Sequence, residues 1–142
     1  MLGHAALVLV MSLVAAEADE TGQDEDLRTK IKSLQVQRVQ TLERGIELAI
    51  AQYVEGMTDL NVFLALQLEL LDAKLATAGT LDDEIQVLKS HLEVVKQTLN
   101  MVTARYEQGR VSELDVIRAK SAALRIEVQL LTRQLTPMQG SD

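Results

Sequence analysis

The 142-residue sequence contains no cysteine and a single proline, Pro137. Without cysteine the chain cannot form a disulfide framework, a thiolate metal site or a lipoprotein anchor. Aromatic residues make up 2% of the chain and tryptophan is absent, whereas compact globular cores usually bury several large rings. The hydrophobic fraction of 47% comes instead from Leu, Val, Ile and Ala, which is typical of helical bundles and coiled coils.

Basic residues are scarce relative to acidic ones. The chain has 14 Lys and Arg against 21 Asp and Glu, for a formal net charge of −7. Nucleic acids and anionic membrane surfaces are bound by clustered positive charge. We therefore expect neither as a partner.

The N-terminus has the features of an export signal. Ala5–Val14 is apolar but too short to span a bilayer, and Ala16-Glu17-Ala18 has the small-x-small pattern of a signal-peptidase site. We expect residues 1–18 to be a signal peptide, with a frayed apolar tail as the alternative and the cleavage position left open. Residues 19–26 are then an acidic linker, and the mature chain, exported to the periplasm or outer membrane, has no membrane span.

A motif occurs twice, 53 residues apart. Residues 53–56 are Tyr-Val-Glu-Gly and residues 106–109 are Tyr-Glu-Gln-Gly. Thr58–Leu60 and Ser112–Leu114 follow, and each has the composition of a helix start. The repeated unit is therefore predicted to be a helix, a tight turn and a returning helix.

The repeat predicts an all-α fold of two tandem antiparallel hairpins that form a four-helix, coiled-coil-like bundle. Gly79 predicts a helix stop, and Thr80 with Asp83 predicts a capping box for the next helix. The expected boundaries are hairpin 1 at 27–76, a loop at 77–84, hairpin 2 at 85–135 and a disordered tail at 136–142.

Heptad spacing predicts which side chains form the core of the hairpins. In hairpin 2 we expect the two arms to face each other through Ile85, Leu88, Leu92, Val95, Leu99, Val102 and Tyr106 on one side and Leu114, Ile117, Ser121, Leu124, Val128, Leu131 and Leu135 on the other. In hairpin 1 the equivalent residues are Val39, Leu42, Ile46, Ala49 and Tyr53, facing Leu60, Phe63, Gln67 and Leu70. Flanking lines such as Val116, Ala123 and Leu130 predict a further partner, either the other hairpin or another subunit.

The segment Ala104–Ala119 resembles the hairpin-tip segment of the TolC-like outer-membrane efflux proteins. In that family a Tyr-x-x-Gly motif is followed by Asp-Val and an Ala, as in Tyr106 to Gly109, Asp115-Val116 and Ala119 here. Family members carry two such repeats, build a trimeric export duct and meet a periplasmic adaptor at their tips. They are much longer and contain a strand-built membrane barrel, for which this sequence shows no period-two segments.

The resemblance implies that the two turns are tips that contact a protein partner, either a periplasmic adaptor or further copies in a homotrimer. The residues it assigns to partner contact are Tyr53, Gly56, Asp59, Tyr106, Gly109, Arg110, Ser112 and Asp115. The first tip departs from the second, because Met57 stands where the second has Arg110 and Asn61 aligns with Asp115. Each residue could instead have a purely structural role. Glycine is common at the C-terminus of a helix, tyrosine can fill the end of a helical core, and a carboxylate in the first turn of a helix interacts favourably with the helix dipole.

No catalytic, cofactor or metal site is expected. His91 has no second histidine, cysteine or carboxylate pair at ligand spacing, and the sequence lacks a nucleophile motif or a phosphate-binding loop. Three non-enzymatic functions stay open. They are a partner-binding module that resembles the periplasmic part of an efflux or secretion duct, a purely architectural periplasmic coiled coil, and a holdase that uses the apolar surface around Leu64–Leu75.

Overall fold

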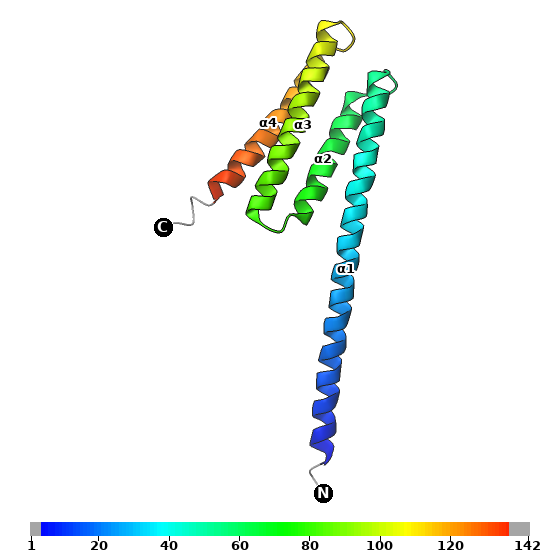
Figure 1. The fold of residues 1–142 in the computed structure, drawn as a ribbon, viewed down its shortest axis with the longest axis vertical. Coiled ribbons are helices and arrows are strands. Elements are labelled where there is room, and N and C mark those ends of the chain that lie inside the picture. Colours follow the sequence, from blue (N-terminus) through cyan, green and yellow to red (C-terminus); the bar gives the residue numbers. More distant parts are fainter. Residues whose placement is uncertain (1–3, 137–142) are drawn as a thin grey trace. The chain divides into compact units, whose positions relative to one another are not determined.

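The computed structural model describes the backbone of residues 4–136 and the side chains of residues 20–136. The described backbone is all-α, which confirms the predicted fold class. Its helices are α1 (His4–Val54), α2 (Leu60–Thr77), α3 (Leu81–Glu107) and α4 (Glu113–Leu135) (Figure 1). The contacts divide the chain into two units, residues 1–37 and residues 38–142.

Unit 1 contains the first part of α1. The helix continues through residues 19–26, where the sequence suggested a linker before the first helix. The segment contains no proline, its Glu and Gln residues favour helix, and its single glycine, Gly22, costs a helix only about 1 kcal/mol. The side chains of the predicted signal peptide, residues 1–18, lie outside the described residues.

In the described part of the chain, no helix has the length and apolarity that a bilayer crossing requires. Beyond Thr136, the predicted tail also lies outside the described residues.

Unit 2 contains both hairpins, one formed by α1 with α2 and the other by α3 with α4 (Figure 1). The connection between them is residues 78–80, shorter than the loop expected at 77–84. Thr80 is the reason, because its Oγ1 accepts a hydrogen bond from the backbone N–H of Asp83 at 3.1 Å. This cap satisfies a free amide of the first turn, so α3 begins at Leu81.

Most of the predicted core of hairpin 1 is buried, whereas Val39 and Ile46 are half-buried. On α1, Leu42, Ala49 and Tyr53 are buried. The four predicted residues of α2 are also buried, at 0–8% exposure: Leu60, Phe63, Gln67 and Leu70. On α3 the predicted residues Leu88, Leu92, Val95 and Val102 are buried as well.

The prediction for α4 is wrong. Its expected core residues are all exposed, and the six large ones are 50–63% exposed: Leu114, Ile117, Leu124, Val128, Leu131 and Leu135. The buried face of α4 instead consists of Ala119, Ala123, Ile126 and Leu130. Those residues also follow heptad spacing, and the two alanines let α4 approach its neighbours closely, as small residues do in helix packing.

Tyr106 also departs from expectation. It aligns with the buried Tyr53, yet 43% of its surface is exposed. Tyr106 therefore does not close the core of hairpin 2.

Candidate partner-binding site at the hairpin tips

Both tips have the same backbone turn. Gly56 and Gly109 adopt positive φ, 76° and 69°, which side chains with a Cβ rarely adopt. Each glycine N–H donates a hydrogen bond to the carbonyl of the tyrosine three residues earlier. The N–H of the next residue donates to the carbonyl five residues earlier, from Met57 to Gln52 at 2.8 Å and from Arg110 to Arg105 at 2.9 Å. These bonds form a Schellman motif, so the structural role expected for both glycines is present.

Asp59 and Ser112 are the N-cap residues of α2 and α4, but neither side chain makes a capping hydrogen bond. Their backbone carbonyls accept from Val62 and Asp115, both at 3.1 Å. The Asp59 carboxylate and the Ser112 hydroxyl therefore remain available at the surface of the tips, where both residues are exposed.

Three side chains join the two tips, and we name them the tip clasp: Tyr53, Arg105 and Asp115. The Tyr53 hydroxyl donates to Asp115 Oδ2 at 3.3 Å. Arg105 Nη2 donates to the Val54 carbonyl at 3.1 Å, and its guanidinium lies over the Tyr53 ring, 5.4 Å from the centroid. The clasp therefore holds the end of α1 against the adjoining ends of α3 and α4.

The surroundings of Tyr53 keep its hydroxyl protonated as a donor. Burial raises the pKa of Tyr53 above its usual 10.0, the neighbouring Asp115 carboxylate raises it further, and the Arg105 charge opposes both effects. A phenolate beside a carboxylate is unfavourable. The hydrogen bond to Asp115 therefore persists at neutral pH.

The outer edge of both tips is exposed, and we name it the tip rim: Met57, Tyr106 and Arg110. Met57 is 66% exposed, and Arg110 is also exposed. A flexible thioether, an amphipathic ring and a guanidinium are side chains common in protein interfaces. The rim suits contact with another protein.

The structure separates the eight predicted site residues into two groups. Tyr53 and Asp115 lie in the clasp and the two glycines shape the turns, whereas Tyr106, Arg110, Asp59 and Ser112 are exposed at the tips. Arg105 was not among the predicted site residues. A comparison of the two repeats could have found it, because Arg105 aligns with the uncharged Gln52 and Asp115 aligns with the uncharged Asn61. Both charged residues contact Tyr53 in the structure.

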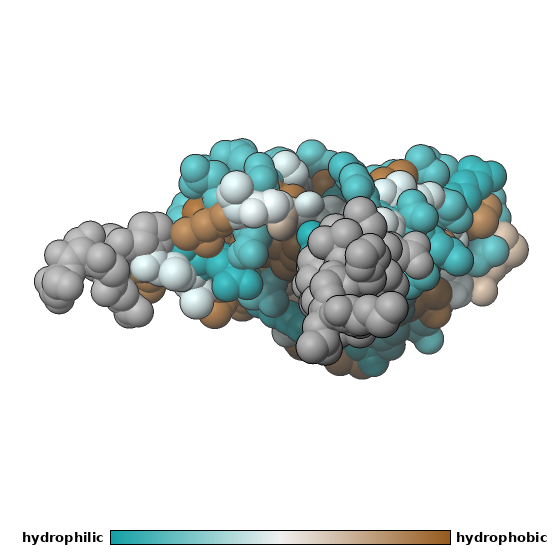
Figure 2. All heavy atoms as spheres, turned by 90° about the horizontal axis from the view of Figure 1, so that it is seen from below, coloured by the Kyte–Doolittle hydropathy of each residue, from teal (hydrophilic) through white to brown (hydrophobic). Residues whose placement is uncertain are grey.

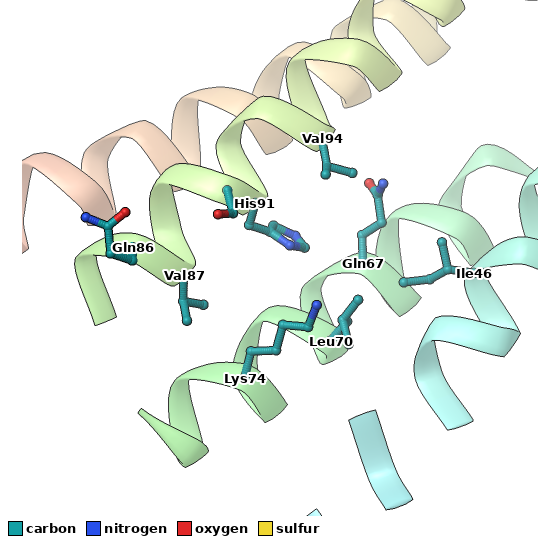
Figure 3. Close-up of a pocket in the computed structure, with 9 residues that line it drawn as sticks. Ile46, Gln67, Leu70, Lys74, Gln86, Val87, His91 and Val94 are labelled. Carbon is teal, nitrogen blue, oxygen red and sulfur yellow. The ribbon is translucent and has the colours of Figure 1, made fainter. Parts of the chain in front are cut away.

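A polar layer lies between the hairpins, below the tips. Gln67 Nε2 donates to Thr98 Oγ1 at 3.2 Å, and His91, 6% exposed, points from α3 toward α2 (Figure 3). A pocket of about 340 Å³ opens here, lined by Ile46, Gln67, Leu70, Lys74, Gln86, Val87, Ser90, His91 and Val94. Buried His91 Nε2 and Gln67 Oε1 have no hydrogen-bond partner among the residues that the structure describes.

Burial, and then the charge of Lys74, lower the pKa of His91 below its ordinary 6.5. Lys74 itself pairs with Glu43 at 2.9 Å. The imidazole is therefore neutral at pH 7, and it is placed to respond to acid as part of the hairpin interface.

Comparison of the chain with protein-family models, with curated proteins and with solved structures found no match.

Proposed function

We propose that this chain is an exported, non-enzymatic coiled-coil protein that presents its paired hairpin tips to a protein partner. The observation that supports this proposal most strongly is the tip clasp. Tyr53 Oη donates to Asp115 and Arg105 donates to the Val54 carbonyl. These bonds hold the backbone of the two tips in one arrangement, so the rim residues are positioned before a partner binds. Preorganisation lowers the entropic cost of binding.

The partner we propose is a periplasmic adaptor of an efflux or secretion assembly. The support is the resemblance of Ala104–Ala119 to TolC-like tips together with the exposure of Arg110 and Met57. Arg110 fits an acidic or carbonyl-rich partner surface, since a guanidinium donates several hydrogen bonds in a fixed fork.

Site-specific photo-crosslinking in bacteria tests this function. A photoreactive residue replaces Met57 or Arg110 on the rim, and the control position is Lys89, an exposed residue of α3 that lies about 27 Å from the tip along its helix. We expect one crosslinked protein at both rim positions and none at Lys89, with Arg110→Glu reducing the yield. Equal crosslinking at all three positions, or none at the rim, would contradict partner binding at the tips.

An architectural role is the second candidate, and one observation favours it. Four of the eight predicted site residues already serve the fold, because Tyr53 and Asp115 bond to each other, and Gly56 and Gly109 adopt the positive φ of their turns. If the tips are only turns, rim substitutions leave every cellular phenotype of the chain unchanged while substitutions in the core abolish it.

The holdase alternative receives less support from packing. Within Leu64–Leu75, Leu64, Leu70 and Leu71 are buried at 8% exposure or less. An unfolded client could not reach these side chains without separating the hairpins.

A further inference from the structure

The outward face of α4 carries an apolar stripe, and we name it the outer stripe: Leu114, Ile117, Ser121, Leu124, Val128, Leu131 and Leu135. Its members alternate by three and four residues without a break, which is the spacing of a coiled-coil seam. The six large side chains are each at least half exposed. The opposite face of α4 packs in the core through Ala119, Ala123, Ile126 and Leu130.

The outer stripe is long for an exposed apolar surface. From Leu114 to Leu135 it runs along almost the whole of α4, roughly 32 Å at 1.5 Å per residue. Figure 2, viewed from the end opposite the tips, shows apolar side chains reaching the surface among polar ones. A continuous stripe of this kind marks an interaction surface rather than scattered exposure.

Other exposed apolar residues of unit 2 form no comparable stripe. Hairpin 1 exposes Leu48, Val54, Met57 and Val62, and α3 exposes Val94 and Tyr106. Neither set follows a continuous heptad spacing. In unit 1, Leu27, Ile31 and Leu34 do follow it, but they span only two helical turns. Within the described chain, the best complement to the outer stripe is therefore another outer stripe.

We propose that the outer stripe is a self-association surface, on which α4 of a second copy packs antiparallel to form a two-fold symmetric dimer. The proposal does not depend on tip binding. An antiparallel pair places the tips of the two copies at opposite ends, so the dimer is a connector with a partner-facing tip at each end.

The side chains favour one antiparallel register. Leu114 faces Leu131 of the second copy, Ile117 faces Val128, and Ser121 faces Leu124. Symmetry repeats each contact, which gives six layers. The small Ser121 always meets the large Leu124, whereas a parallel pair would place the two Ser121 residues together and leave a gap in the seam.

The flanking charges pair differently in the two orientations. In this register Lys120 lies beside Glu127 of the second copy, twice by symmetry. Arg118 comes near the other copy's Arg125, but Arg118 already has Asp115 beside it at 3.7 Å. A parallel pair would instead bring Lys120 beside Arg125 and Glu113 beside Arg118 of the second copy, so the packing of Ser121, and not the charge balance, favours the antiparallel orientation.

A single helix pair is small compared with the roughly 1,600 Å² of a standard interface. We therefore expect a dissociation constant in the micromolar range. Sedimentation equilibrium of the full chain across that range tests the proposal, with Leu124→Glu as the seam variant and Leu48→Glu as the control. Leu124 and Leu48 are 52% and 50% exposed, so both variants should keep their helicity by circular dichroism.

The expected result is a monomer–dimer equilibrium that Leu124→Glu weakens at least tenfold and Leu48→Glu leaves unchanged. A monomer at all concentrations, a trimer, or equal weakening by both variants would overturn the proposal. Loss of the dimer in Ile31→Glu would also overturn it, because that result would place the contact in unit 1.

Charge reversal at Lys120 tests the orientation independently of folding. In the antiparallel dimer Lys120→Glu puts two carboxylates together at both symmetric positions, and we expect roughly tenfold weaker association. Adding Glu127→Lys restores the pairs and should restore the affinity. In a parallel dimer Lys120→Glu would meet Arg125 and strengthen association, so a tighter dimer would overturn the antiparallel assignment.

Discussion

The two return helices, α2 and α4, occupy equivalent places in the repeat but have different surroundings. Leu60, Phe63, Gln67 and Leu70 of α2 are 0–8% exposed, whereas the aligned Leu114, Ile117, Ser121 and Leu124 of α4 are exposed, the three large ones by 50–56%. Helix α2 lies between α1 and the second hairpin (Figure 1), whereas α4 contacts α2 and α3 through one face and its opposite face is exposed. A hydrophobic pattern thus shows that a face can be covered, and neighbouring elements decide whether it is.

The largest difference between the two helices should appear at the first aligned pair. Leu60→Ala removes a side chain that is 0% exposed, and we expect it to lower the free energy of unfolding by about 2–5 kcal/mol. Leu114→Ala removes a half-exposed side chain and should cost less than about 1 kcal/mol. Urea unfolding at low micromolar concentration measures both. Equal losses in the free energy of unfolding would mean that Leu60 of α2 and Leu114 of α4 are equally buried, contrary to the structure.

The tyrosine pair gives a smaller contrast. Tyr53→Phe deletes the hydroxyl that donates to Asp115 at 3.3 Å, and we expect a loss of about 0.5–1.5 kcal/mol in the free energy of unfolding. Tyr106→Phe, at the aligned exposed position, should change it by no more than about 0.5 kcal/mol. If Tyr106→Phe proved the more costly of the two, the clasp would not be the contact that joins the tips.

The interface that covers α2 should weaken in acid. The pKa of His91 is lowered in the folded state by burial and then by Lys74, so below pH 6.5 the unfolded chain binds a proton that the folded chain does not. Stability contributed at this site is complete above pH 6.5 and falls as the pH decreases toward the folded-state value. Chemical unfolding from pH 8 to pH 5 measures the slope.

His91→Leu is the control for that slope. The leucine side chain fills a similar space without titrating, so the decline between pH 6.5 and pH 5 should become shallower. An unchanged slope in His91→Leu would assign the pH dependence to other groups.

Most of the fold follows from the sequence, because heptad spacing and turn residues determine helices locally. The Schellman turns at Gly56 and Gly109 and the cap at Thr80 lie where the local sequence predicts them. The helical course of residues 19–26 was missed, because a polar, acidic composition suggests a linker although Glu and Gln also favour helix.

The face of α4 could not be chosen from its pattern. Both of its stripes have heptad spacing, and the larger side chains favour the stripe with Leu124 over the one with Ala119 and Ala123. In the structure the stripe with the two alanines is the buried one, because small side chains allow α4 to pack closely against its neighbours. The tip clasp was missed for a related reason, because it joins Tyr53 of one repeat to Arg105 and Asp115 of the other, and contacts between repeats are not encoded in the spacing within either.

We infer that the clasp holds the two tips together as one rigid surface, and this inference can be tested by measuring the distance between spin labels at Met57 and Arg110. The chain contains no cysteine, so Met57→Cys with Arg110→Cys labels only these two exposed positions. We expect a single narrow distance distribution in pulsed electron resonance, which broadens when Arg105→Ala removes part of the clasp. A distribution that is broad from the start, or that Arg105→Ala leaves unchanged, would show instead that the tips move independently.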